Sequence, residues 1–155
     1  MTKQIVTGLI TALMCLSMTG GAAARPDLRD GALVAQTATL KKMKSPIYPG
    51  VEPGFEYNVL LETDKAIGGT SMHTILLEFV KVSLTDALQR LDTNLVAQGF
   101  KKNHEQIVKG STIRNYLNAA GDSVHVQVSA YKPGAAGKVA GSKGTMNITV
   151  RKPEK

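Results

Sequence analysis

Several stretches of the chain alternate between hydrophobic and polar residues, the pattern of a half-buried β-strand. The first predicted strand places Phe55, Tyr57, Val59 and Leu61 on one face. The next, SMHTILLEFV, is apolar on both sides, which indicates a central strand. Strict alternation recurs later in SVHVQVSAY and TMNITVR, and a weaker form of it in FKKNHEQIV and TIRNYLNA. These stretches predict a sheet.

One stretch between the second and third predicted strands has the period of an α-helix instead. Its leucines recur at steps of four, three and four residues, which places them on one stripe. Ser83 and Asp86 are placed to cap the first turn, and Gly99 is placed to end the last. The sequence therefore predicts one amphipathic helix whose apolar stripe is Leu84, Leu88, Leu91 and Leu95.

The order of these elements predicts an α+β fold. We expect a small antiparallel or mixed sheet of about five to six strands, with the helix packed on one face. Residues 55–152 would form this single domain. Residues 25–54, which contain KKMKSPIYPGVEPG, are rich in proline and glycine turns and predict an extended arm in front of it.

Residues 1–24 have the three-part pattern of a secretory signal peptide: one lysine, an apolar run, and small residues ending at Ala24. Cleavage there would remove Cys15, the only cysteine, and leave a mature chain without a disulfide. Acylation of Cys15, as in a bacterial lipoprotein, would require a small residue directly before it, and Met14 is not small. We therefore expect a periplasmic or secreted protein with no transmembrane segment in its mature chain.

The charge balance is basic, with 19 lysines and arginines against 12 acidic residues. The excess lies in the C-terminal part, from Lys101 onward. For an exported protein this excludes nucleic acid as the expected partner and favours an anionic envelope component or an envelope protein. Peripheral contact with a membrane is compatible with such a surface. The competing explanation of the excess positive charge is that it only keeps a small protein soluble.

A glycine-rich stretch with three lysines, residues 132–144, separates the last two predicted strands. It lacks the spacing of a nucleotide-binding P-loop, and a strand follows it rather than a helix. We expect a long, mobile and cationic connection. The sequence leaves open whether Lys132, Lys138 and Lys143 bind an anionic surface or belong to a segment that only connects two strands.

A second candidate surface is the sheet face that a single helix leaves uncovered. Planar and amide side chains there suit recognition of a sugar or an extended peptide, although one polar, solvated face is also normal for an antiparallel sheet. The residues predicted to share this face for binding are Arg114, Tyr116, His125, Gln127, Tyr131 and Arg151.

Signals for catalysis are few. Ser71 and His73 lie on the same side of a predicted strand, which permits a nucleophile–base pair, but no orienting acid is evident. No metal or cofactor motif is complete, and the sequence predicts neither. It favours a non-enzymatic binding module of the bacterial cell envelope. Two alternatives stay open: a small hydrolase using Ser71 and His73, and a structural subunit that docks through the arm.

Overall fold

The structure is a computed structural model that describes residues 39–154. The predicted signal peptide and residues 25–38 of the predicted arm lie outside the described residues. Within the described part, no helix is both long and apolar enough to span a bilayer.

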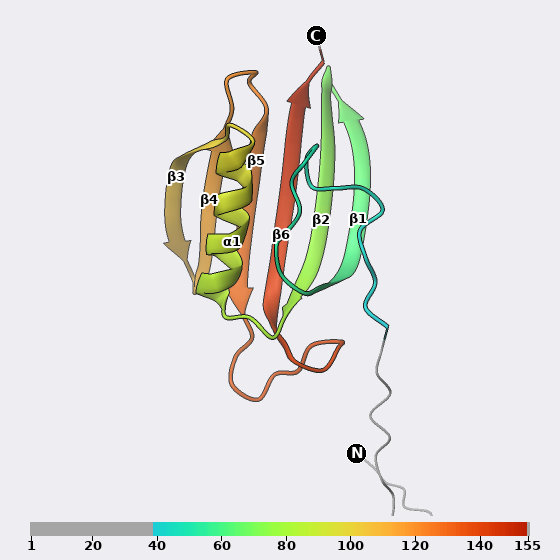
Figure 1. The fold of residues 1–155 in the computed structure, drawn as a ribbon, viewed down its shortest axis with the longest axis vertical. Helices are drawn as coiled ribbons and strands as arrows, with labels where there is room; N and C mark the ends of the chain where they lie inside the picture. Colours follow the sequence, from blue (N-terminus) through green and yellow to red (C-terminus); the bar gives the residue numbers. More distant parts are fainter. Residues whose placement is uncertain (1–38, 155) are drawn as a thin grey trace, which may run out of the picture. The chain divides into compact units, whose positions relative to one another are not determined.

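Six antiparallel strands form one sheet, in the order β1-β2-β6-β5-β4-β3 (Figure 1). The first two strands form a hairpin, and the last four form a meander that returns beside β2. Helix α1, the one helix among residues 39–154, connects the two groups. The predicted α+β fold with one helix is therefore confirmed, and its sheet is antiparallel throughout. The strands are β1 Tyr57–Ile67, β2 Thr70–Val80, β3 Lys101–Val108, β4 Ser111–Leu117, β5 Ser123–Ala130 and β6 Ser142–Pro153.

Helix α1, Leu84–Ala97, has the predicted ends and the predicted stripe. The Ser83 hydroxyl accepts a hydrogen bond from the backbone amide of Asp86 at 3.1 Å. At the other end, Gly99 has a left-handed backbone, and the Phe100 amide donates to the Leu95 carbonyl as in a Schellman motif. The buried residues of the helix are Ala87, Leu88, Leu91 and Leu95.

The described part of the arm, residues 39–54, packs on the same face of the sheet as α1 (Figure 1). Ile47 and Val51 are buried in the hydrophobic core. The helix fixes the arm by its polar side: Arg90 donates to the Gly54 carbonyl at 3.1 Å, and Asn94 donates to the Glu52 carbonyl at 2.8 Å. Helix and arm together close one face, which we call the covered face.

The strand registers assign each side chain to a face. Ile75 pairs with Ile148, and Ile148 pairs with Val126, so these buried residues line the covered face. The alternate residues on the same strands face the other way and form what we call the open face. On β2, β6 and β5 these include Thr74, Leu76, Asn147, Thr149, His125 and Gln127.

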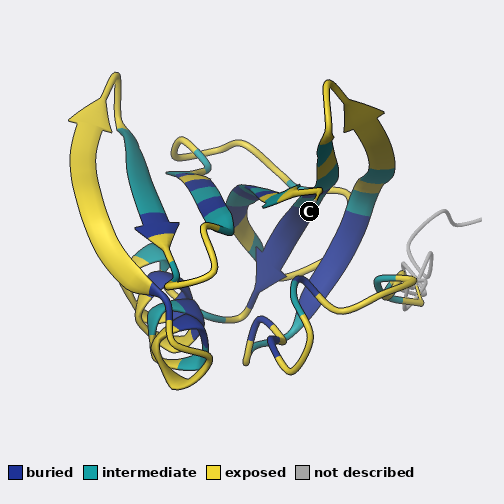
Figure 2. Ribbon diagram, turned by 90° about the horizontal axis from the view of Figure 1, so that it is seen from above, coloured by how far each residue is buried: buried dark blue, intermediate teal, exposed yellow. Residues whose placement is uncertain are grey.

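The two edges of the sheet are more exposed than its centre (Figure 2). Every residue of the edge strand β3 is exposed. In β1, a bulge between Val59 and Leu61 shifts the register, so Leu61 points away from the covered face and is half exposed. The expectation that Leu61 continues the face of Tyr57 and Val59 is therefore wrong, because alternation fails beyond a bulge.

A buried carboxylate joins three separate segments at one end of the sheet. Glu78 accepts hydrogen bonds from the Tyr131 hydroxyl at 2.6 Å, the Lys138 backbone amide at 2.7 Å and the Asn58 side chain at 3.2 Å. Asn58 also accepts from the Lys41 amide. The glycine–lysine stretch is therefore attached to the sheet, and its Val139 is buried, which its composition did not predict.

These contacts determine the titration of Glu78. Burial alone would raise the pKa of the carboxyl group, but the hydrogen bonds that it accepts outweigh burial and hold the pKa below its ordinary value of 4.5. Burial raises the pKa of Tyr131 to about 12, and the hydrogen bond to Glu78 and the charge of that carboxylate act in the same direction. A depressed carboxyl pKa stabilises the fold above the unfolded-state pKa and loses that effect as pH falls through the folded-state pKa.

We predict that Glu78→Gln lowers the free energy of unfolding at pH 7 by about 1.5–3 kcal/mol, because hydrogen bonds to a charged group are lost. The difference from the parent should stay constant down to about pH 5 and shrink below pH 4.5, where the parent carboxylate also becomes protonated. Urea unfolding across this pH range measures it, with Gln127→Glu on the exposed part of the open face as a control. Equal stability of Glu78→Gln and parent at pH 7 would contradict this role.

Candidate functional site

The structure divides the six residues predicted for the sheet face. His125, Gln127 and Arg151 lie on the open face, as their pairing with Thr149, Asn147 and Ser123 shows. Tyr131 follows the last residue of β5, and its hydroxyl donates a hydrogen bond to Glu78. The remaining two, Arg114 and Tyr116, face the other way.

Arg114 and Tyr116 pair with Val126 and Val124, so they lie on the covered face beneath the helix. The expectation that they share a face with His125 is wrong. Tyr116 is buried, and its burial, together with Asp92, raises the pKa of its hydroxyl.

On the covered face, the guanidinium group of Arg114 is close to two acidic side chains. Its guanidinium lies 3.2 Å from a Glu105 carboxylate oxygen and 3.9 Å from Asp92 on the helix. Long amphipathic side chains can cover a sheet and still reach a charged partner, which is why polarity alone gave the wrong face. Arg114 therefore links helix, β3 and β4.

A pocket of about 390 Å³ opens on the open face where β3 and β5 begin and β4 and β6 end. His125 and Arg151 both line it, together with amide, hydroxyl and apolar groups from the neighbouring strands. We call it the open-face pocket. Its lining includes no acidic residue. Its residues are Asn103, Asn115, Tyr116, Leu117, Ser123, Val124, His125 and Arg151.

Asn103 enters the open-face pocket because of a second bulge. The register between β3 and β4 shifts between Lys102 and His104, so Asn103 has no partner in the ladder. Bulges of this kind redirect one side chain out of the regular alternation. Sequence alternation alone gave no signal for Asn103. It also did not show that Asn115 stands opposite His125.

His125 is held in one orientation and one tautomer. Its Nδ1 lies 2.6 Å from the Asn115 side-chain oxygen, and because that oxygen only accepts, Nδ1 carries the proton. Burial lowers the pKa of His125, and the positive charge of Arg151 lowers it further. Neutral His125 therefore offers a lone pair at Nε2, and protonation converts Nε2 into a second donor.

Arg151 brings a positive charge that the chain does not neutralise. Its side chain is exposed and forms no ion pair with any residue of the described part of the chain. Arginine presents several donors in a planar fork that suits carboxylate, phosphate or sulfate. With the amides of Asn103 and Asn115 and the Ser123 hydroxyl nearby, the open-face pocket has the donors that an anion requires.

The three lysines of the glycine–lysine stretch lie at the opposite end of the sheet, where β5 ends and β6 begins (Figure 1). Lys132, Lys138 and Lys143 are exposed. Lys143 belongs to β6, and Lys138 is bound to Glu78 through its backbone only. These lysines are therefore a second cationic surface, separate from the open-face pocket.

Ser71 and His73 share a face, but neither ring nitrogen of His73 is directed at the Ser71 hydroxyl. Nδ1 of His73 lies 2.6 Å from Asp64, and Nε2 lies 3.6 Å from Glu62. The Ser71 hydroxyl instead donates to the Lys152 carbonyl at 3.5 Å. Asp64 could orient the histidine, but this arrangement gives Ser71 no base.

Among residues 39–154, no group of three or more His, Cys, Asp or Glu side chains is arranged to hold a metal ion. Comparison with protein-family models, curated protein sequences and solved structures found no match.

We predict that sulfate binding in this pocket strengthens as pH falls. A bound anion favours the imidazolium and raises the pKa of His125 from its lowered value, so by linkage sulfate affinity must rise as pH falls through the interval between the two values. Above that interval, affinity should be independent of pH. NMR titration of the His125 ring, with and without sulfate, measures both effects. His73, which lies on the covered face, provides an internal control, and an unchanged His125 titration would contradict the prediction.

Proposed function

We propose that this protein is an exported, non-enzymatic binding module of the bacterial cell envelope, which holds an anionic group of an envelope component in the open-face pocket. The observation that carries this proposal is the uncompensated Arg151 beside His125 in a pocket without acidic residues. The signal-peptide pattern of residues 1–24 supports export.

The distribution of charge over the described residues supports the same proposal. Most acidic side chains there are hydrogen-bonded or ion-paired within the chain, whereas several of the surface cations have no acidic partner. These acids are Glu56, Glu62, Asp64, Glu78, Asp86, Asp92, Glu105 and Asp122. In contrast, Lys132, Lys138, Lys143 and Arg151 form no ion pair within residues 39–154.

The lysines of the glycine–lysine stretch fit an auxiliary role in this function. They are exposed on a segment that Glu78 holds in place, so they can approach an extended anionic surface at little cost in loop entropy. Each would add about 1 kcal/mol near an anionic lipid surface. The open-face pocket would supply the specific contact and the lysines a less specific attraction.

We predict that the mature chain binds lipopolysaccharide or phosphatidylglycerol vesicles at low salt, and that binding weakens steeply as salt rises. Replacing Arg151 with glutamine should lower affinity roughly fivefold, the equivalent of about 1 kcal/mol for one cation. Replacing Lys132, Lys138 and Lys143 together should lower it roughly a hundredfold on an extended surface.

Co-sedimentation and calorimetry measure these affinities. Arg90→Gln is a matched control, because this arginine lies on the helix and donates to the Gly54 carbonyl. Glucuronate tests the pocket without a surface: its affinity should fall in Arg151→Gln and stay unchanged in the triple lysine variant. A parent chain that binds none of these anions at low salt would contradict the proposed function.

A further inference from the structure

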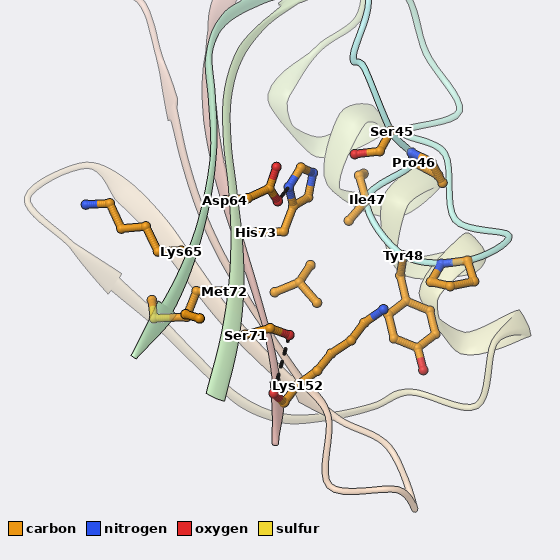
Figure 3. A pocket seen from close by; sticks show the side chains of 13 residues that line it. Ser45, Pro46, Ile47, Tyr48, Asp64, Lys65, Ser71, Met72, His73 and Lys152 are labelled. Atoms are coloured by element: carbon orange, nitrogen blue, oxygen red, sulfur yellow. Dashed lines mark hydrogen bonds and ion pairs between the residues drawn. The ribbon is translucent and has the colours of Figure 1, made fainter. Parts of the chain in front are cut away.

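A second pocket, of about 550 Å³, lies on the covered face between the arm, the β1–β2 hairpin and the end of β6 (Figure 3). We call it the arm pocket. Pockets of this size, largely apolar with a few polar groups, are typical of small-molecule sites. The apolar lining combines Pro46, Ile47, Tyr48 and Pro49 of the arm with Ala66 and Val150 of the sheet, whereas the side chain of Met72 lies on the other face.

The side chain of Lys152 extends across the opening of the arm pocket. The Lys152 ammonium lies 4.5 Å from the centroid of the Tyr48 ring, a cation–π contact (Figure 3). Tyr48 itself is fixed, since its hydroxyl donates to Asp122 at 2.7 Å and its ring packs edge-on against Phe100. Lys152 forms no ion pair with any of residues 39–154.

The acidic groups near the arm pocket are already engaged. Asp64 is bonded to His73 at 2.6 Å. Glu62 is almost fully covered and accepts hydrogen bonds from the backbone amides of Lys44 and Ser45. Lys65 contributes to the wall, but its side chain points away from the pocket (Figure 3). Of the basic side chains that line the pocket, Lys152 is the one that extends across it, while the largely exposed carboxylate of Asp64 places a negative charge at its wall.

We infer that the arm pocket binds a small anionic amphiphile, a molecule with a compact apolar body and one acidic head group. The apolar body would pack on Ile47 and Val150, and the head group would accept hydrogen bonds from the Lys152 ammonium and the Ser71 hydroxyl. At 3.5 Å, the bond from Ser71 to the Lys152 carbonyl is long, so the hydroxyl can turn to a ligand. This site and ligand are independent of the open-face pocket.

Neighbouring residues of β6 provide the test, because Arg151 lines the open-face pocket and Lys152 the arm pocket. Octanoate, 1-octanol and octylammonium serve as probes in calorimetry with the mature chain. We expect octanoate to bind most tightly. Lys152→Met should weaken octanoate roughly tenfold, as for one charge-assisted hydrogen bond, and leave octanol unchanged. Arg151→Met should leave octanoate unchanged and weaken sulfate.

A second variant tests the location without removing charge. Ser71 is exposed, so Ser71→Phe can fill the mouth of the arm pocket without entering the core, and it should weaken octanoate and octanol together. Octanoate that fails to bind the parent, that binds Lys152→Met as tightly as the parent, or that weakens equally in Arg151→Met would overturn the inference. So would octylammonium binding as tightly as octanoate.

Discussion

The structure depends on one constraint: the sheet has two faces, and residues 39–154 supply apolar cover for only one of them. Helix α1 closes part of the covered face with its leucine stripe, and the arm closes more of it with Ile47 and Val51. Helix and arm also bind each other through Arg90 and Asn94. The open face has no such cover over its centre, so it carries polar side chains that tolerate water. A polar surface on a rigid sheet is then available to a ligand.

The last strand connects the two candidate sites. Because side chains alternate along a strand, Arg151 and Lys152 emerge on opposite faces at the same end of β6. One lies beside His125 in a polar pocket without acids, and the other lies over Tyr48 at the mouth of a mostly apolar pocket. Two neighbouring cations thus meet two different environments, and this difference is the reason for proposing a hydrated anion for one pocket and an amphiphile for the other.

Much of the fold followed from local patterns. The leucine spacing, Ser83 and Gly99 were enough to place the helix, and strict alternation was enough to place β5 and β6. The faces of Leu61, Arg114 and Tyr116 were not predictable in this way. A bulge reverses the alternation at Leu61, and the two amphipathic side chains are polar at one end and apolar along the rest.

The candidate site was predictable only in part. His125, Gln127 and Arg151 stood out as polar residues on alternating strands, but Asn103, Asn115 and Ser123 join the pocket only through strand register and a bulge. The sequence did not predict that the glycine–lysine stretch is bound to the sheet through Glu78. This residue lies within an apolar run, where a buried carboxylate is unexpected. Such contacts depend on how strands far apart in the sequence pair, and local sequence patterns do not predict that pairing.

Hydrogen–deuterium exchange of the mature chain, with and without lipopolysaccharide at low salt, tests the central claim most directly. If the open face holds an anionic envelope component, protection should rise where the strands border the open-face pocket: the start of β3, the end of β4, the start of β5 and the end of β6. The glycine–lysine stretch should gain less. Protection confined to that stretch, or to the helix on the covered face, would contradict the account.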